Sequence, residues 1–302
     1  MLKPDLPLIM DAEGDGPPAG LPPVVDAHVH IFPRTLFAAI HQWFDAHAWP
    51  IRYRMNTDAV LDFLFDRGVA HLVALQYAHK PGIAVSLNQY MAAKCARFGK
   101  RVIGMATIYP GERNARAILE AAFDAGLAGV KLHAHVQCFD MNDAQMAPVY
   151  EVCAERAKPI IMHVGREPNS PQYACDPHLI CRADKLERVV REHPRLRVCV
   201  PHLGMDELTA YRHLIEKYDN LWLDTTMALS EYLPLQEGID LASYRWQRVM
   251  YGSDFPNIPY AWDRELKHLA RMNLSAQALE WVLHRSAADF FQTAFQPNLP
   301  SS

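Results

Sequence analysis

Eight short apolar runs, separated by longer amphipathic stretches, constrain the fold of this 302-residue chain more than any other feature. Each run is rich in Val, Ile, Leu or Met and almost continuously hydrophobic, which is typical of strands buried on both faces of a parallel sheet. The runs are Val24–His30 (VVDAHVH), Val69–Tyr77, Val102–Tyr109, Gly129–His133, Pro159–His163, Arg197–His202, Leu221–Thr225 and Arg248–Asp254.

The stretches between the runs carry apolar residues at helical spacing. The helices expected from this spacing are Thr57–Arg67, Ala115–Ala125, Met146–Arg156, Asp184–His193, Leu208–Lys217 and Ser275–Leu283, with Thr57 and Ser275 as N-caps. A doubly wound open sheet is one alternative, but the Gly-rich phosphate turn of such sheets is absent. Eight strand–helix units in sequence therefore predict an α/β fold, a (β/α)8 TIM barrel.

The barrel is expected to be one domain, residues 24–295. Residues 1–23 are acidic and Pro-rich and lack the basic and apolar segments of a signal peptide, so they predict a flexible N-terminal tail. Residues 296–302 are expected to form a C-terminal tail. Length alone permits two domains, yet single α/β barrels reach this size.

Charge and cysteine usage exclude several classes of partner. The net charge is −4 and no basic stripe is present, which argues against nucleic acid. No apolar run approaches the roughly 18 residues of a membrane span. The six cysteines form no Cys-x-x-Cys pair, which favours a reduced, cytoplasmic setting. Cys175 and Cys181, with Asp176 and His178 between them, allow a second metal site or a plain substrate loop.

The first run ends in two histidines, His28 and His30. Alternate residues of a strand share a face, so Asp26, His28 and His30 are expected to point the same way. Two imidazoles on one face are able to hold one metal ion, and neutral imidazole nitrogen suits zinc and its divalent neighbours. Taken alone, this spacing is weak support for a metal site.

Polar residues also stand at the downstream ends of the other runs. The set is His28, His30, Lys131, His133, His163, His202 and Asp254. In a barrel the carboxyl ends of the strands meet on one face, where catalytic groups gather. A random scatter of the chain's 15 histidines would not select these ends, so the pattern predicts one polar site.

This constellation resembles the amidohydrolase superfamily and, within it, the amidohydrolase-related (type 2) group that includes aminocarboxymuconate-semialdehyde decarboxylase. The resemblance extends from Val24 to Phe291. The phrases that carry it are VVDAHVH, GVKLH, PIIMHVG, VPHLG, LWLDTT and VMYGSDFP.

The resemblance implies one divalent metal ion per chain, expected to be Zn²⁺, held by His28, His30, His163 and Asp254. Such an ion lowers the pKa of its bound water towards about 7. Asp254 and His202 are the implied catalytic residues, Asp254 as a general base and His202 as an acid/base group. His202 binding a second metal is the alternative.

Lys131, His133 and Arg166 are the expected substrate-binding residues. In binuclear relatives the fourth-strand lysine is carboxylated and bridges two metals. An unmodified Lys131 would instead pair with a substrate carboxylate or hydrogen-bond a ligand, and we favour one metal and an unmodified lysine. Arg166 either clamps a substrate carboxylate or forms a surface ion pair. The aromatic segment Ile31–Met55 either covers the barrel mouth or packs on its wall as a peripheral helix.

Three functions follow from this resemblance. The first is a metal-dependent hydrolase that acts on an amide, ester or lactone of a small carboxylated molecule. The second is a non-oxidative decarboxylase of an aromatic or muconate-type acid; hydroxybenzoate decarboxylases often carry Glu in place of the first histidine, so His28 slightly favours hydrolysis. The third is a non-catalytic barrel that binds metal or a metabolite. A homodimer is expected, since barrels of this kind often dimerise.

Overall fold

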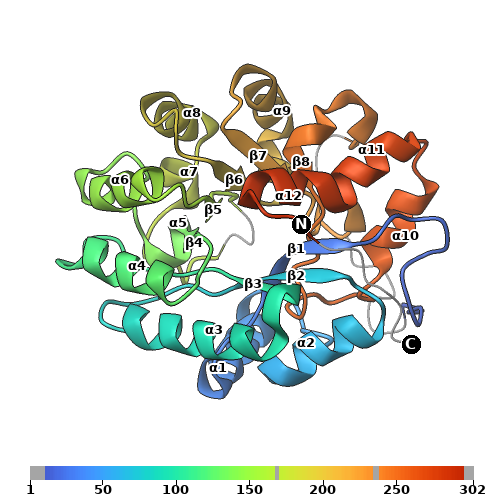
Figure 1. The fold of residues 1–302 in the computed structure, drawn as a ribbon, viewed down its shortest axis with the longest axis horizontal. Coiled ribbons are helices and arrows are strands. Elements are labelled where there is room, and N and C mark those ends of the chain that lie inside the picture. Colours follow the sequence, from blue (N-terminus) through green and yellow to red (C-terminus); the bar gives the residue numbers. More distant parts are fainter. Residues whose placement is uncertain (1–10, 167–169, 234–237, 296–302) are drawn as a thin grey trace.

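The computed structural model of the protein describes residues 11–166, 170–233 and 238–295. Within them, eight parallel strands alternate with helices (Figure 1). The strands are β1 (Val25–His30), β2 (His71–Leu75), β3 (Val102–Gly104), β4 (Val130–His133), β5 (Ile160–His163), β6 (Val198–Val200), β7 (Leu221–Asp224) and β8 (Val249–Met250). Each lies inside one of the eight runs predicted from the sequence.

Backbone hydrogen bonds join the strands into a ring. They pair in the orders β1-β2-β3 and β4-β5-β6-β7-β8. Between β3 and β4, the Ala106 N–H donates to the Gly129 carbonyl and the Lys131 N–H to the Ala106 carbonyl, both at 2.8 Å. After β8, the Phe255 carbonyl accepts from the His30 N–H of β1, also at 2.8 Å. The predicted (β/α)8 TIM barrel is therefore confirmed.

The helices surround this ring, except for the last one, which lies across the strands (Figure 1). They are α1 (Arg34–His47), α2 (Thr57–Asp66), α3 (Ala84–Phe98), α4 (Ala115–Asp124), α5 (Ala134–Gln137), α6 (Ala147–Glu155), α7 (Pro177–Ile180), α8 (Ala183–Glu192), α9 (Leu208–Lys217), α10 (Arg264–Arg271), α11 (Ala276–Glu280) and α12 (Ser286–Phe291). Ser275 caps α11 as predicted, by accepting the Ala278 N–H. At α2 the cap is Asn56, which accepts the Ala59 N–H, rather than the expected Thr57.

The sequence did not predict α3, whose buried face is partly polar. Asn88 lies on that face beside Leu87 and Met91. Its side-chain amide donates to the Thr107 carbonyl at 3.0 Å and accepts the Thr107 N–H at 2.7 Å. An asparagine at a core position interrupts the apolar spacing that marks a helix, although its polar atoms are fully paired.

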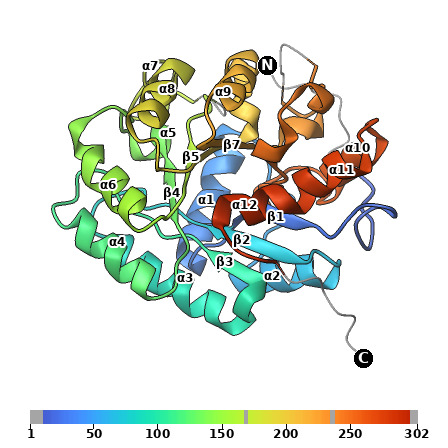
Figure 2. The same cartoon turned by 45° about the horizontal axis from the view of Figure 1, so that its top comes forward.

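A hydrophobic cluster fills the interior of the barrel, with Val73, Ile161 and Trp222 among its buried side chains. Phe290 of α12 joins this cluster, and its ring lies 5.3 Å from that of Trp222. In Figure 1 and Figure 2, α12 lies across the strands rather than in the outer ring. The ring of Phe295, just after α12, contacts His71, the first residue of β2. The core therefore closes the amino-terminal end, and the site lies at the opposite end.

Residues 1–10 and 296–302 lie outside the described part of the chain. The described N-terminal segment, which begins at Asp11, contacts the barrel. Asp11 pairs with Arg264 at 3.0 Å and Glu13 with Arg52 at 3.2 Å. The Gly14 N–H donates to the Asp263 carboxylate. Within the described ranges, every helix is too short or too polar to span a membrane.

Candidate metal centre

His28, His30 and Asp254 converge at the carboxyl end of the barrel. The Oδ1 atom of Asp254 lies 3.1 Å from His30 Nε2 and 3.5 Å from His28 Nε2. The possible ligand atoms of the three residues all lie within 4.8 Å of one another, and all three side chains are buried. This is the His–Asp group that the strand ends predicted.

Asp26 holds the segment that presents Asp254. The register between β1 and β2 shifts after Asp26, whose carboxylate accepts the Ser253 N–H at 3.0 Å and the Ser253 hydroxyl at 2.5 Å. Burial raises the pKa of Asp26 to about 7, against the lowering effect of these hydrogen bonds. Asp26 therefore positions the neighbouring loop rather than joining His28 and His30 in the metal group.

The backbone next to Asp254 is unusually close to its neighbours. A Cβ atom at Gly252 would lie 2.4 Å from Thr226 Oγ1 and 2.7 Å from His28 Cβ, so only glycine fits there. Asp254 itself has φ 65°, and His202 has φ 58°. Both predicted catalytic residues thus have left-handed backbone, a strained conformation that is typical of functional sites.

A buried carboxylate orients His28. The Asp224 Oδ2 atom lies 2.9 Å from His28 Nδ1, which places the ring proton on Nδ1 and the lone pair on Nε2. Burial and the charge of Lys131 lower the pKa of His28 to about 3. Burial opposes ionisation of Asp224, but its hydrogen bond and the charge of His28 lower its pKa to about 2.

Lys131 lies beside the same imidazole. Its Nζ atom is 3.3 Å from His28 Nε2 and is inaccessible to solvent. Burial lowers the pKa of Lys131 to about 8, although the carboxylates of Asp224 and Asp254 oppose the shift. The ammonium group is therefore the one cation within this cluster, as far as the described residues show.

His202 and His163 form a second hydrogen-bonded pair. His202 Nδ1 lies 2.8 Å from the Thr226 carbonyl, which only accepts, so the proton is on Nδ1. His202 Nε2 then accepts from His163 Nδ1 at 3.2 Å. This leaves the Nε2 lone pair of His163 buried and without a partner among the described residues. Such an orphaned nitrogen fits a metal ligand.

His163 also belongs to a group with His133 and His135. The possible ligand atoms of these three histidines lie within 4.8 Å of one another, and the His133 ring stacks on His163 at 4.0 Å. Burial holds the pKa of His133 and of His163 well below the usual value. The structure thus places His163 beside His133 rather than within the tight group of His28, His30 and Asp254.

One cavity connects most of these side chains. His30, Asp254, His202, His163 and His133 all line a single pocket at the carboxyl ends of the strands. The structure therefore brings every predicted metal and catalytic side chain except His28 to the wall of this pocket. His28 does not line the pocket but contacts Asp254, which does.

Arg166 does not reach this pocket. Its guanidinium contacts Asp206 at 3.0 Å and Glu207 at 3.3 Å. It lines neither described cavity of the site. Of the two interpretations that the sequence left open, the structure favours the ion pair.

The loop with Cys175 and Cys181 shows no metal group in the described residues. Asp176 instead caps α7, because its side chain accepts the His178 N–H at 2.9 Å. The second metal site that the sequence left open here is therefore not supported.

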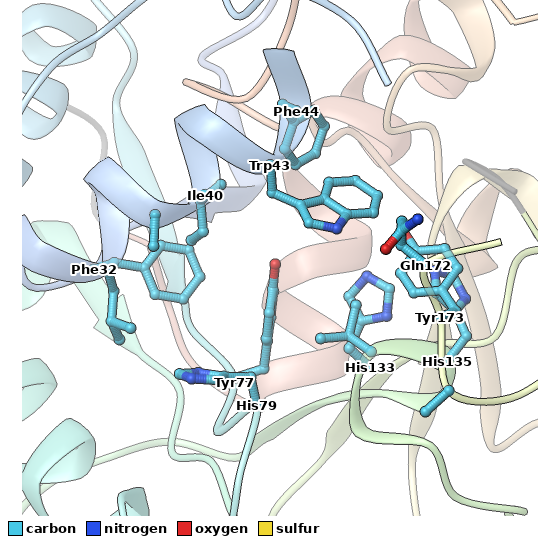
Figure 3. A pocket seen from close by; sticks show the side chains of 14 residues that line it. Phe32, Ile40, Trp43, Phe44, Tyr77, His79, His133, His135, Gln172 and Tyr173 are labelled. Atoms are coloured by element: carbon cyan, nitrogen blue, oxygen red, sulfur yellow. The ribbon is translucent and has the colours of Figure 1, made fainter. Parts of the chain in front are cut away.

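A larger pocket of about 380 Å³ opens next to the histidines (Figure 3). Tyr77, Phe44 and His133 line both this pocket and the smaller cavity, so the two adjoin each other across these side chains. Trp43 of α1 and Tyr173 form one wall, with ring centroids 5.3 Å apart. We refer to this space as the aromatic pocket.

Sequence reasoning identified the histidines but missed two residues that support the site. Asp224, in the run Leu221–Thr225, orients His28 and accepts the His202 N–H. Glu265 of α10 is buried and accepts the Met227 and Leu229 N–H groups. An acidic residue directly at a strand end was the available signal for Asp224, whereas no local pattern marks Glu265.

A parallel barrel with a His–Asp group at its carboxyl ends defines a class of TIM-barrel proteins with a candidate metal centre. The amidohydrolase family model Amidohydro_2 matches residues 25–293. The chain belongs to this family, as the resemblance in its motifs indicated. None of the curated proteins compared with the chain matches it significantly.

Solved structures support the fold. An uncharacterized TIM-barrel protein, Bb4693 from Bordetella bronchiseptica, is 18% identical over 90% of this chain and 99% of its own, with a TM-score of 0.71. A 5-carboxyvanillate decarboxylase from Novosphingobium aromaticivorans, solved with manganese and 4-hydroxy-3-methoxy-5-nitrobenzoic acid, is 16% identical over 93% and 100%, with a TM-score of 0.65.

A dihydroxybenzoic acid decarboxylase from Polaromonas sp. JS666, solved with manganese and the inhibitor 2-nitroresorcinol, is also similar. It is 14% identical over 90% of this chain and 97% of its own, with a TM-score of 0.65. At these identities the likeness establishes the barrel fold alone.

Proposed function

We propose that this chain is a metal-dependent, non-oxidative decarboxylase of an aromatic acid. The observation that carries the proposal is that the aromatic pocket adjoins the cavity lined by His30, His202 and Asp254. The pocket accepts a flat apolar ring, and the polar end is where a carboxylate would react. Two structural neighbours act on aromatic acids, according to their names.

The donor set fits a divalent ion. His28, His30 and Asp254 offer two neutral imidazoles and a carboxylate, and the orphaned Nε2 of His163 offers a fourth ligand across the pocket. A bound ion would act as a Lewis acid towards the oxygen atoms of the substrate. The sequence predicts one Zn²⁺, whereas the two decarboxylases contain manganese, so both metals belong in the test.

The residues around the ion would hold and move the proton. Decarboxylation breaks the bond between the ring and the carboxylate, releases CO₂ and adds one proton to the ring carbon. His202 and Asp254 both line the pocket where that carbon would lie. We assign the proton transfer to these two side chains. Lys131, behind His28, supplies positive charge close to the reacting carboxylate.

The test is CO₂ release from hydroxylated benzoates by protein loaded with Mn²⁺ or with Zn²⁺. Release that depends on the metal, and that is lost in the Asp254→Asn variant, supports the proposal. If folded, metal-loaded protein releases no CO₂ from any acid of the panel, the decarboxylase assignment is wrong.

Metal-dependent hydrolysis is the second candidate. It is favoured by Asp254, whose burial is outweighed by hydrogen bonding and charge from His30, so that its pKa is lowered and the carboxylate is ionised, as a general base must be. The same protein preparations should therefore also be assayed with aryl esters and lactones. Hydrolysis without CO₂ release would replace the first proposal with this one.

A further inference from the structure

Asn257 has an unpaired polar side chain in the wall of the smaller cavity, beside the aromatic pocket. The residue lies in the loop after β8, is 2% exposed and lines this cavity together with His30, His202 and Asp254. Its Oδ1 atom is buried and has no hydrogen-bond partner among the described residues. Buried amides in folded proteins are almost always hydrogen-bonded, so an unpaired one in a cavity wall indicates a group that binds a ligand.

The backbone of Asn257, in contrast, is fully paired. Its N–H group donates to the Asp254 carbonyl at 2.9 Å. Its carbonyl accepts the indole N–H of Trp49 at 2.8 Å. These two bonds fix the position from which the side chain extends and use none of the polar atoms of its amide. The side chain is therefore held in the cavity wall with its hydrogen-bonding capacity unused.

The amide differs chemically from the other polar groups of this cavity. The described lining residues otherwise offer imidazoles, the Asp254 carboxylate and the Tyr77 hydroxyl. We assigned the imidazoles of His30 and His163 and the Asp254 carboxylate to the metal ion. An amide is uncharged and carries two N–H donors and a carbonyl acceptor. Asn257 is therefore able to donate to a substrate oxygen without adding charge to the metal centre.

We propose that Asn257 is a substrate-binding residue whose side-chain N–H group donates a hydrogen bond to the carboxylate of an aromatic acid. This inference rests on the proposed function, which places that carboxylate in the smaller cavity. A carboxylate only accepts hydrogen bonds, and no partner in the protein fixes which end of the amide faces the cavity, so Nδ2 is free to face it.

The hydrogen bond should act on binding rather than on the chemical step. A hydrogen bond to an ionised group is stronger than one between neutral groups. During decarboxylation the negative charge moves from the carboxylate to the ring, so the bond to Asn257 is at least as strong in the bound substrate as in the transition state. Loss of the amide should therefore raise KM, with little change in kcat.

The test measures binding of benzoate to the full chain loaded with Mn²⁺, by calorimetric titration. Asn257→Ala should bind benzoate at least about tenfold more weakly than the wild type does, because a hydrogen bond to a charged group is lost. Its metal content should equal that of the wild type, since Asn257 is outside the candidate metal groups. An unchanged affinity, or a wild type that binds no benzoate, would overturn the assignment.

Asn257→Ser separates hydrogen bonding from packing. Serine is close in size to alanine and keeps one donor, so Asn257→Ser should bind benzoate at least about threefold more tightly than Asn257→Ala does. Equal affinities of these two variants would show that Asn257 only fills space, and the proposal would be wrong.

Two further variants complete the test. Asn257→Asp keeps the shape of the side chain but removes its donor, so it should also bind benzoate at least about tenfold more weakly; if Asn257→Ala does not fold, unchanged affinity in Asn257→Asp overturns the proposal. Asn114→Ala is the matched control, because Asn114 is exposed before α4 and its side chain makes no cap hydrogen bond. An equal loss of affinity in Asn114→Ala would count against a specific role for Asn257.

The two proposals fail in different ways. Benzoate binding that depends on the Asn257 amide, without CO₂ release from any aromatic acid, would support the carboxylate-binding role and refute the decarboxylase. CO₂ release with KM and benzoate affinity unchanged in Asn257→Ala would support the decarboxylase and refute the role of Asn257.

Discussion

The inner and outer ends of the site differ in charge. At the inner end, Asp224, Asp254 and Lys131 lie within a group of buried imidazoles, and each ionised side chain has a partner. At the outer end, the aromatic pocket has rings from α1 and from the segment around Tyr173, and its described lining residues include no Asp, Glu, Lys or Arg. A buried charge needs a partner to offset the free-energy cost of its desolvation. Burial of an apolar side chain, in contrast, is favourable in free energy without any partner.

This difference separates reactivity from recognition. The inner end provides the ligand atoms and the groups that transfer protons, so substitutions there should affect metal content and turnover. The outer end provides only shape and apolar surface, so substitutions there should affect KM and substrate preference. Substitutions at each end test whether the two ends are independent in this way.

Loss of the metal ligand at the inner end should have the largest effect. Asp254→Asn removes the carboxylate that joins His28 and His30, so bound metal should fall well below one per chain. Turnover should fall by at least about 10³-fold, because removal of a charged ligand abolishes the reactive centre. Elemental analysis and steady-state rates measure both effects.

Asp45→Asn is the control for Asp254→Asn, because Asp45 is an exposed partner of Arg54 outside the pocket. Full metal content in Asp254→Asn would show that the ligand assignment is wrong.

His202→Gln should separate turnover from metal binding. The imidazole faces the pocket but lies outside the group of His28, His30 and Asp254. We expect near-normal metal content with kcat lowered about 10²-fold or more, the usual contribution of a general acid or base. His213→Gln, on the exposed face of α9, should leave both unchanged. Metal loss in His202→Gln would instead make His202 a ligand.

Asp224→Asn should have an intermediate effect. The amide is able to keep one hydrogen bond to His28 Nδ1 but loses the charge that makes this imidazole a better donor. Metal affinity should fall about tenfold to 100-fold, as is typical for a residue that orients a ligand. A competitive chelator titration checks this value. An unchanged affinity would show that Asp224 acts only on the loop, through the N–H groups of His202 and Thr226.

Sequence reasoning reached the inner end because strand ends are local features. His28, His163 and His202 each end an apolar run, and parallel strands bring such ends together. Asp26 shows the limit of this argument. Strict alternation places it with His28 and His30, but a register shift in β1 turns it towards Ser253.

The shape of the outer end was beyond sequence reasoning for a different reason. Of the two interpretations of Ile31–Met55, the cover over the mouth agrees with the structure, because Leu36, Ile40 and Trp43 of α1 line the pocket. Trp43 meets Tyr173, 130 positions later, through a contact that no periodicity encodes. Pocket shape depends on such contacts between connecting segments.

Trp43→Ala should weaken binding with little effect on the chemical step. The indole forms part of the outer wall, and its loss removes apolar contact with the substrate body and with Tyr173. KM should rise about tenfold, equivalent to about 1.4 kcal/mol, with kcat within about threefold of the wild type. Trp43→Phe should restore most of the affinity. A fall in kcat alone would show that the two ends are coupled.

Arg166→Gln should have the smallest effect, and it tests the boundary of the site. The sequence allowed Arg166 to bind a substrate carboxylate, which would make its loss costly in KM. In the structure its side chain is 16% exposed, and its guanidinium pairs with Asp206 and Glu207. Partly exposed ion pairs contribute up to about 1 kcal/mol, so unfolding should shift slightly and KM should stay within about twofold. A tenfold rise in KM for monocarboxylates would return Arg166 to the pocket and break the separation between a charged inner end and a neutral outer end.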